Sequence, residues 1–316
     1  MSIIRLQHYG ITVAEHTRSS RFYSKIMRIP RLGSVVRKPG RSMIGRHLGV
    51  PTVRITWLQR GHDSIELFNF PEIKDDPLPP LRRDFKNVGA ARIGFRVVST
   101  RGFEHVFSSK NIEYKKAVDP WGEEYLSFSD PDSIPMAVYG GADKGVYLDR
   151  ASITVSNLDK SIAFYSVLLG LPQTSAVRLG MARDIFPDST YDGSVRVARV
   201  GIENQGVELV EFQGIDRSQN TTWFPDPGGP FDSKYTSIGI KHVCFQAKGT
   251  VKWVKKLQSE GVRVIMGPAR EPTGLWVTYL LDPDGTIIEL YELPAAMTKL
   301  MRGASLFWAR FLTRRI

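Results

Sequence analysis

Apolar and polar residues alternate in two short stretches near the end of the chain, in the pattern typical of half-buried β-strands. In residues 241–245, the alternation sends His242 and Cys244 to one face of a strand and the apolar residues to the other. Residues 282–285 spell an Asp-Pro-Asp-Gly turn signal, and the strand predicted after it carries Glu289. Two separate predicted strands therefore carry a histidine and a carboxylate.

A longer pattern of strand, helix and further strands recurs along the chain. Residues 7–13 predict a strand, the next segment a helix with a Phe-Tyr pair, and residues 54–58 and 64–70 two more strands. An offset of 142 leads to a second copy of this stretch. The corresponding pairs are Val13 and Val155, Phe22 and Phe164, Tyr23 and Tyr165, Pro30 and Pro172, and Glu66 and Glu208. A constant offset over this length indicates an internal duplication.

The two remaining segments match each other in the same way. Residues 92–95 correspond to residues 242–245 at an offset of 150, and the Asp-Pro-Asp motif at 130–132 corresponds to that at 282–284 at an offset of 152. The sequence therefore predicts an α+β fold built from four β-α-β-β-β units.

Segments rich in Pro and Gly separate the units, at residues 77–80, 140–143 and 226–230. We therefore expect two halves of ordinary domain size, residues 1–140 and 146–293, followed by a tail at residues 294–316. The tail holds five Lys or Arg residues and no acidic residue, interspersed with large apolar side chains. This composition predicts a basic amphipathic helix that docks on the protein or on a partner subunit.

Composition narrows the class of protein. A chain of 316 residues with 42% hydrophobic residues is long enough for two globular domains. No apolar run approaches the roughly 18 residues of a membrane span, and no signal peptide precedes the first strand pattern. We expect a soluble, cytoplasmic protein without a transmembrane segment. Cys244 is the only cysteine, which excludes an intrachain disulfide and a thiolate metal cluster.

The formal net charge of +11 bears on the partners. No basic stripe interleaved with aromatic residues and no nucleic-acid-binding motif accompanies it, so we expect no nucleic acid partner. The basic balance favours an anionic small substrate or a membrane surface instead.

The Phe-Tyr helices, the Asp-Pro-Asp-Gly turn and the strands that carry His and Glu resemble the vicinal oxygen chelate superfamily. This superfamily includes glyoxalase I, methylmalonyl-CoA epimerase, fosfomycin-resistance proteins and extradiol dioxygenases, and the resemblance covers about residues 3–293. It implies that two units face each other to form an open, glyoxalase-like β cup. It also implies one metal-ligand position on the first strand and one on the last strand of each unit.

Carried over to this sequence, the resemblance assigns a pair of ligand positions to each unit. These pairs are His8 and Glu66, Arg92 and Ala137, Arg150 and Glu208, and His242 and Glu289. Arginine has no lone pair to give to a cation, so only the first and fourth units hold complete pairs. The four other histidines, His16, His47, His62 and His105, lie away from these positions and are predicted at the surface.

Two pairings of the units follow from the resemblance. If the first unit faces the fourth, as in glyoxalase I, then His8, Glu66, His242 and Glu289 surround one divalent ion of Ni, Co, Zn, Mn or Fe. The second cup then holds Arg92, Arg150 and Glu208 as structural charges in a closed or vestigial site. If neighbours pair instead, as in extradiol dioxygenases, Glu208, His242 and Glu289 remain. We expect the first arrangement, because it gathers every candidate ligand in one place.

The resemblance implies three functions. In the first, the metal chelates two adjacent oxygens of a small oxygen-rich substrate, and Glu289 or Glu66 transfers a proton in glyoxalase, lyase or isomerase chemistry. The alternatives are an Fe(II) ring-cleaving dioxygenase and a metal-free protein that sequesters a small molecule. Glutathione is not expected, because Thr12 and Phe70 stand where glutathione-using glyoxalases tend to carry Arg and Asn. A homodimer is compatible with each function.

Overall fold

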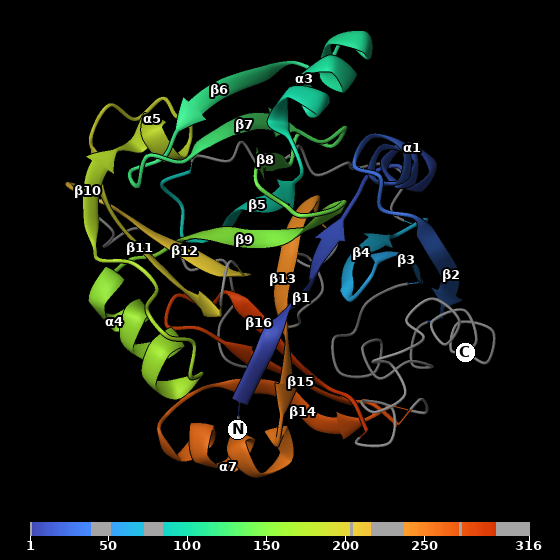
Figure 1. Cartoon of the computed structure of the whole chain (residues 1–316). Coiled ribbons are helices and arrows are strands. Elements are labelled where there is room, and N and C mark those ends of the chain that lie inside the picture. Colours follow the sequence, from blue (N-terminus) through green and yellow to red (C-terminus); the bar gives the residue numbers. More distant parts are fainter. Residues whose placement is uncertain are drawn as a thin grey trace. The chain divides into compact units, whose positions relative to one another are not determined.

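The structure is a computed structural model that describes residues 2–38, 52–72, 85–202, 205–215, 237–271 and 274–294 (Figure 1). The chain divides into two compact units, Met1–Leu81 with Phe224–Ile316, and Arg82–Trp223. Each unit contains one eight-stranded sheet. Within the described ranges, no helix combines the length and the apolar character that crossing a membrane requires.

The first unit combines the first and the fourth repeat. The first repeat contains β1 (Ser2–Thr12), α1 (His16–Arg21), the π-helical turn η1 (Phe22–Ile26), β2 (Arg31–Arg37), β3 (Val53–Arg60) and β4 (Asp63–Asn69). The fourth contains β13 (Gly239–Lys248), α7 (Thr250–Ser259), β14 (Val264–Arg270), β15 (Trp276–Leu281) and β16 (Ile287–Glu292). The strand order is β14-β15-β16-β13-β1-β4-β3-β2. Figure 1 shows β1, in blue, beside its antiparallel partner β13, in orange.

The second unit combines the second and the third repeat. The second repeat contains β5 (Gly89–Val97), α3 (Thr100–Ser109), β6 (Tyr114–Val118), β7 (Glu124–Ser129) and β8 (Pro135–Tyr139). The third contains β9 (Val146–Thr154), α4 (Leu158–Ala163), the π-helical turn η2 (Phe164–Leu168), β10 (Arg178–Met181), α5 (Ala182–Ile185), β11 (Ser194–Ile202) and β12 (Gln205–Phe212). The strand order β10-β11-β12-β9-β5-β8-β7-β6 repeats that of the first unit. The predicted α+β fold of four β-α-β-β-β units in two open β cups is confirmed.

The sheet orders also decide which repeats share a cup. The first repeat pairs with the fourth and the second with the third, through the β1–β13 and β5–β9 ladders. Each of the sequence halves, residues 1–140 and 146–293, therefore gives one repeat to each compact unit. The halves follow the order of the repeats along the chain, whereas the compact units follow the strand pairing.

Burial along the strands follows their place in the sheets. Nearly every residue of β13, which is central, is buried, whereas the edge strands β2 and β6 hold only exposed and half-buried residues. Lys115 and Lys116 are exposed on β6, where charged side chains discourage pairing with another chain. The central strands that bear ligands are therefore buried on both faces, and the edge strands are not.

The Phe-Tyr pairs occupy equivalent places in the first and third repeats. In both, an α-helix widens into a single π-helical turn that begins at the Phe, at Phe22 and at Phe164. Both pairs are buried, as predicted for residues that pack on the sheet. Since π-helical turns are rare, their recurrence at the same offset supports the equivalence of the two repeats.

Some predictions fall on residues that the structure does not describe. The amphipathic helix expected in the tail at residues 294–316 lies outside the described residues except for Pro294, and so do the joins at 77–80 and 226–230.

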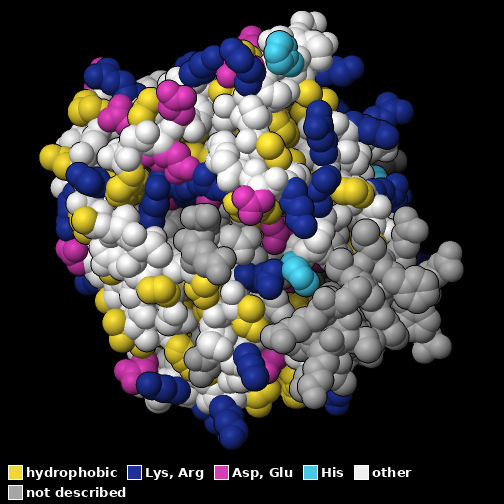
Figure 2. Space-filling view, viewed as in Figure 1, with side chains coloured by type: hydrophobic (Ala, Val, Ile, Leu, Met, Phe, Trp, Pro, Cys, Tyr) yellow, Lys and Arg dark blue, Asp and Glu magenta, His cyan; other side chains and the backbone are white. Residues whose placement is uncertain are grey.

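On the face in Figure 2, Lys and Arg side chains are spread over the described surface and are interleaved with Asp and Glu.

Candidate metal centre

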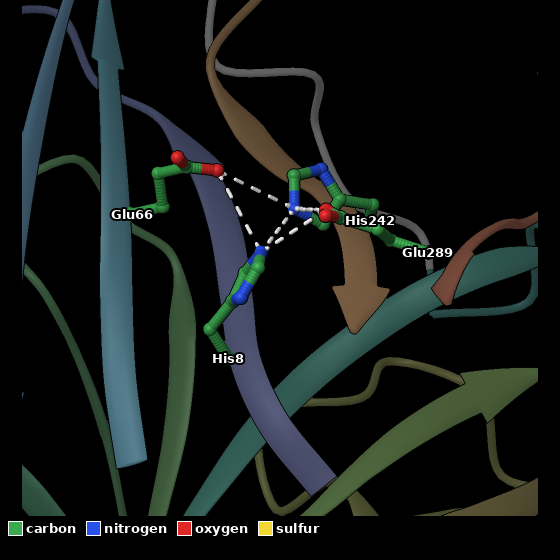
Figure 3. A group of neighbouring side chains, drawn as sticks. All are labelled: His8, Glu66, His242 and Glu289. Atoms are coloured by element: carbon green, nitrogen blue, oxygen red, sulfur yellow. Dashed lines mark hydrogen bonds and ion pairs between the residues drawn. The ribbon is translucent and has the colours of Figure 1, made fainter. Parts of the chain in front are cut away.

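Four side chains from four strands of the first unit point toward one another (Figure 3). His8 comes from β1, Glu66 from β4, His242 from β13 and Glu289 from β16. One ligand atom from each lies within 4.8 Å of the others, and all four residues are buried. The structure thus brings together the four residues that the sequence predicted as ligands of one metal.

Three of these atoms form a tight triangle. His8 Nε2 lies 2.9 Å from His242 Nε2 and 3.1 Å from Glu289 Oε2, and His242 Nε2 lies 3.0 Å from Glu289 Oε2. Two ligand atoms at right angles, each about 2.1 Å from one ion, lie about 3.0 Å apart. The spacing therefore fits atoms that share a metal ion. Two carboxylates balance the charge of a divalent cation, and the donor set suits Zn, Ni, Co, Mn or Fe.

Glu66 is set back from this triangle. Its Oε2 lies 3.6 Å from His8 Nε2 and 3.7 Å from His242 Nε2. Its other oxygen, Oε1, accepts a hydrogen bond of 2.7 Å from the indole N–H of Trp57 on β3. Trp57 therefore fixes the carboxylate with one oxygen toward the histidines and the other turned away.

His8 is oriented by its neighbour Gln7. A register shift between Leu6 and His8 in the β1–β13 ladder marks an irregularity at Gln7. The Gln7 side-chain oxygen contacts His8 Nδ1, and its amide nitrogen donates to Ser64 Oγ at 3.1 Å. In this arrangement Nδ1–H of His8 donates to the Gln7 side chain, and the lone pair on Nε2 is left for a metal. Histidines that bind metals usually have their other ring nitrogen hydrogen-bonded in this way.

The imidazole of His242 occupies the space that a side chain at position 10 would need. Gly10 lies opposite His242 in the β1–β13 ladder, and a Cβ at Gly10 would lie 2.1 Å from His242 Cε1. Real Cβ atoms do not approach other heavy atoms so closely, so any side chain at this position displaces the imidazole.

We expect Gly10→Ala to weaken metal binding by about 10–100-fold, the range found when a ligand loses its supporting contacts, because His242 must leave its position. A chelator-competition titration measures the effect. Gly102→Ala is the matched control, since a Cβ there meets nothing within 4 Å. The steric cause is checked by unfolding the metal-free proteins: His242→Ala should restore the stability that Gly10→Ala loses. A double variant no more stable than the single one would contradict it.

The pKa values reflect burial and mutual charge. Burial raises the pKa of Glu66 to about 7. At Glu289, the charge of His8 and hydrogen bonds from both imidazoles outweigh burial and hold its pKa well below its ordinary value. Burial lowers the pKa of His242, whereas the two carboxylates outweigh burial at His8 and raise its pKa. His242 is therefore held in the neutral form that ligates metals.

The other candidate residues lie in the second unit. Glu208, the alternative ligand, is fully buried and accepts a hydrogen bond of 2.9 Å from Arg92. Arg150 pairs with Asp149 and Glu123, at 2.9 and 3.0 Å. Glu208 therefore belongs to an ion cluster of its own unit and lies outside the His/Glu group.

Among the remaining histidines, the prediction of a surface position is wrong for His16. It is buried and contacts the Thr56 hydroxyl, because α1 packs against the sheet. His62 and His105 are exposed as predicted, and His47 lies outside the described residues.

Sequence reasoning missed the residues that support the ligands, namely Gln7, Gly10, Trp57 and Ser64. One signal could have found two of them. At the offset of 142, Gly10 corresponds to Ser152 and Trp57 to Arg199. Both residues therefore differ in the third repeat, in which Arg150 replaces the ligand His8. The bulge that places Gln7 against His8 has no such signal.

Comparisons with known proteins agree with this fold. Residues 147–290 match the model of the Glyoxalase/Bleomycin resistance protein/Dioxygenase superfamily. Glyoxalase I from Zea mays has a TM-score of 0.65 at 16% sequence identity, covering 94% of this chain and 95% of that chain. A putative dioxygenase from Bacillus subtilis subsp. subtilis str. 168 has a TM-score of 0.63 at 13% identity, covering 93% and 86%. No curated protein matches the chain.

The family match covers the third and fourth repeats. It agrees with the resemblance to vicinal oxygen chelate proteins on which the sequence prediction rests. Glyoxalase and dioxygenase enzymes are among the members of this superfamily. At identities of 13–16%, the two solved structures share the fold with this chain.

Proposed function

We propose that the protein is a divalent-metal-dependent enzyme that binds two adjacent oxygens of a small substrate and transfers a proton between neighbouring carbon atoms. The observation that carries this proposal is the convergence of two histidines and two glutamates within 4.8 Å in a buried site. When bound there, a divalent ion would polarise the two substrate oxygens and stabilise negative charge that develops on them.

The distances in the site indicate a separate role for each residue. His8, His242 and Glu289, whose atoms form the tight triangle, would hold the metal. Glu66 is set back, and its Oε2 faces the site while Trp57 holds Oε1. We assign Glu66 as the general base, with Oε2 as the atom that takes and returns the proton. Burial of all four side chains strengthens the electrostatic interactions of the site.

A second candidate function rests on the same triangle. Two histidines and one carboxylate with open positions opposite them form the ligand face typical of non-haem Fe(II) oxygenases. If Glu66 stays off the metal, as its longer distances to both histidines suggest, this face could bind a catechol and O₂. The metal and the reaction distinguish the two functions.

The test is metal-dependent proton exchange. The metal-loaded protein is incubated in D₂O with a panel of α-hydroxycarbonyl compounds, and deuterium at carbon is followed by NMR. We expect exchange with at least one compound, dependence on the metal, and a loss of about 10²–10⁴-fold in Glu66→Gln, the usual contribution of a positioned base. Glu113→Gln, which changes an exposed glutamate, is the control. Exchange that survives in Glu66→Gln, or O₂ uptake with catechols and Fe(II) without exchange, would contradict the proposal.

A further inference from the structure

The second unit has a cavity of about 280 Å³ at the place that corresponds to the metal-ligand group of the first. The correspondence rests on strand register. Gly10 pairs with His242 and with Glu66 in the first unit, and Ser152 pairs with Arg92 and with Glu208 in the second.

Arg150 stands at the position of His8, and Ala137 at that of Glu289. The second unit therefore replaces metal ligands with guanidinium groups. The site expected around these arginines was closed or vestigial; it is not closed, because Arg150 lines an open cavity.

The wall of the cavity is rich in arginine. Arg96, Arg150 and Arg199 line it, and Glu123 is the single acidic residue among the described lining residues. Three further carboxylates pair with these arginines, and their side chains have almost no exposed surface: Asp119, Asp149 and Glu208. The charges of the arginines are therefore compensated within the unit, and a ligand in the cavity meets guanidinium groups while these three carboxylates stay buried.

Arg92 has a different role from the arginines of the wall. It is 2% exposed and donates to Glu208, to the Ser152 hydroxyl, to the Tyr139 hydroxyl and to the Ile185 carbonyl. Its donors are used inside the unit, so Arg92 supports the site without lining it.

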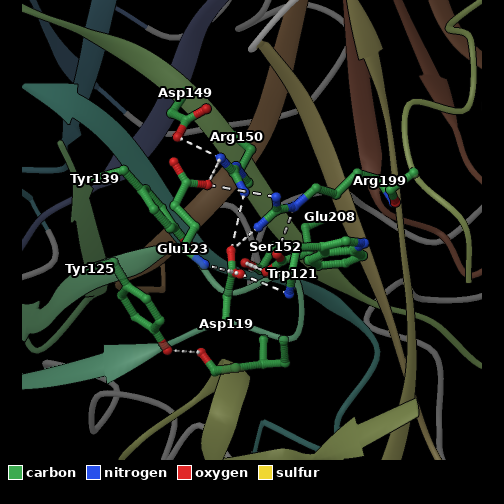
Figure 4. A network of polar contacts seen from close by, with 12 residues as sticks. Asp119, Trp121, Glu123, Tyr125, Tyr139, Asp149, Arg150, Ser152, Arg199 and Glu208 are labelled. Carbon is green, nitrogen blue, oxygen red and sulfur yellow. Dashed lines mark hydrogen bonds and ion pairs between the residues drawn. The ribbon is translucent and has the colours of Figure 1, made fainter. Parts of the chain in front are cut away.

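The arginines of the wall are held in place by aromatic rings (Figure 4). The guanidinium carbon of Arg199 lies 3.9 Å from the ring centroid of Trp121, and that of Arg150 lies 4.3 Å from that of Tyr139. Stacking of this kind fixes the plane of a guanidinium group, and with it the direction of the N–H groups that no carboxylate accepts. The donors are therefore arranged before any ligand arrives.

Four buried donors of lining side chains lack a hydrogen-bond acceptor among the described residues. They are Arg96 Nε, Trp121 Nε1, Arg150 Nη1 and Arg199 Nε. The carboxylate oxygens that pair with two of them, Asp119 Oδ2 with Arg150 Nη1 and Glu208 Oε2 with Arg199 Nε, lie 3.7 and 3.5 Å away. Unpaired buried donors are costly, and four of them beside one cavity point to a missing acceptor.

We propose that the cavity of the second unit is a separate binding site for a small molecule that bears an oxyanion, either a carboxylate or a phosphate. The cavity volume admits only a small ligand, and the unpaired donors Arg150 Nη1 and Arg199 Nε suit an oxygen of either group. The site has no imidazole and needs no metal. It is thus independent of the His/Glu group of the first unit.

The test is isothermal titration of the metal-loaded protein with inorganic phosphate and, separately, with malonate. We expect at least one probe to bind, and its affinity to fall at least about tenfold in Arg199→Gln, because a charge-assisted hydrogen bond is lost. Arg196→Gln is the matched control, since Arg196 lies on the same strand and pairs with Asp159 and Glu211 outside the cavity. The probe that binds more tightly distinguishes a carboxylate from a phosphate site.

A second variant distinguishes loss of a donor from misfolding, which Arg199→Gln alone does not. Trp121→Phe keeps a ring beneath the guanidinium group but removes the N–H donor, and we expect it to weaken binding in the same direction without changing the thermal unfolding temperature. Binding of neither probe, or binding that Arg199→Gln and Trp121→Phe leave unchanged, would overturn the proposal. The second result would place the anion at the metal of the first unit.

Discussion

Replacing His242 by glutamine will lower the affinity of the protein for a divalent metal by at least about 100-fold. The loss of affinity should exceed the 10–100-fold typical of changing a residue that only supports a ligand, because His242 supplies a ligand atom directly. Its Nε2 lies at 2.9 and 3.0 Å from the neighbouring ligand atoms, and the residue is fully buried, so water cannot readily replace the imidazole. Competition with a metallochromic chelator gives the affinity, and circular dichroism verifies the fold.

The chain offers a matched control for this prediction. His105 is exposed on α3 in the second unit, so His105→Gln removes an imidazole without touching the site. Glu208→Gln tests the alternative ligand, and it should leave metal affinity unchanged because Glu208 hydrogen-bonds to Arg92 and Ser152. Metal binding that depends on Glu208 and tolerates loss of His242 would refute the assignment.

The second large effect concerns the buried ion pair between Arg92 and Glu208. Arg92→Met should reduce the free energy of unfolding by about 3–5 kcal/mol, because it leaves Glu208 as a buried charge without its closest charged partner. The two residues are 2% and 0% exposed. Urea unfolding of the metal-free protein at neutral pH measures the change.

Two further variants separate charge from packing. Arg196→Met removes a half-exposed arginine from a surface pair on β11, which should cost no more than about 1 kcal/mol. In the Arg92→Met/Glu208→Gln double variant the buried charge is gone, so most of the lost stability should return. Equal effects of Arg92→Met and Arg196→Met would show that the buried pair is not a special source of stability.

The sequence predicted the four repeats because they depend on local signals: alternation and turn signals located the strands, and constant offsets related the repeats. The ligand group of His8, Glu66, His242 and Glu289 was implied by the resemblance to vicinal oxygen chelate proteins. The pairing of the first repeat with the fourth rested on a weaker argument, the gathering of ligands, because periodicity shows which residues are buried but not against which strand. The β1–β13 ladder supplies that information.

The missed residues depend on that same ladder. The need for glycine at position 10 exists only because His242 lies opposite it, and the contact between Gln7 and His8 follows a register shift that no composition signal marks. The cavity of the second unit was missed for a related reason. Arg199 and Trp121 lie outside the assigned ligand positions, so only the folded sheet shows that they meet Arg150.

Diffraction from a crystal grown with a transition metal, recorded at the absorption edge of that metal, tests the central claim most directly. We predict one anomalous peak per chain, within bonding distance of His8 Nε2, His242 Nε2 and Glu289 Oε2. The arginine-lined cavity of the second unit should show no such peak, because guanidinium groups cannot ligate a cation. Metal bound at another position, or no metal between the two histidines in a protein whose His/Glu group is intact, would contradict the assignment and favour a metal-free binding protein.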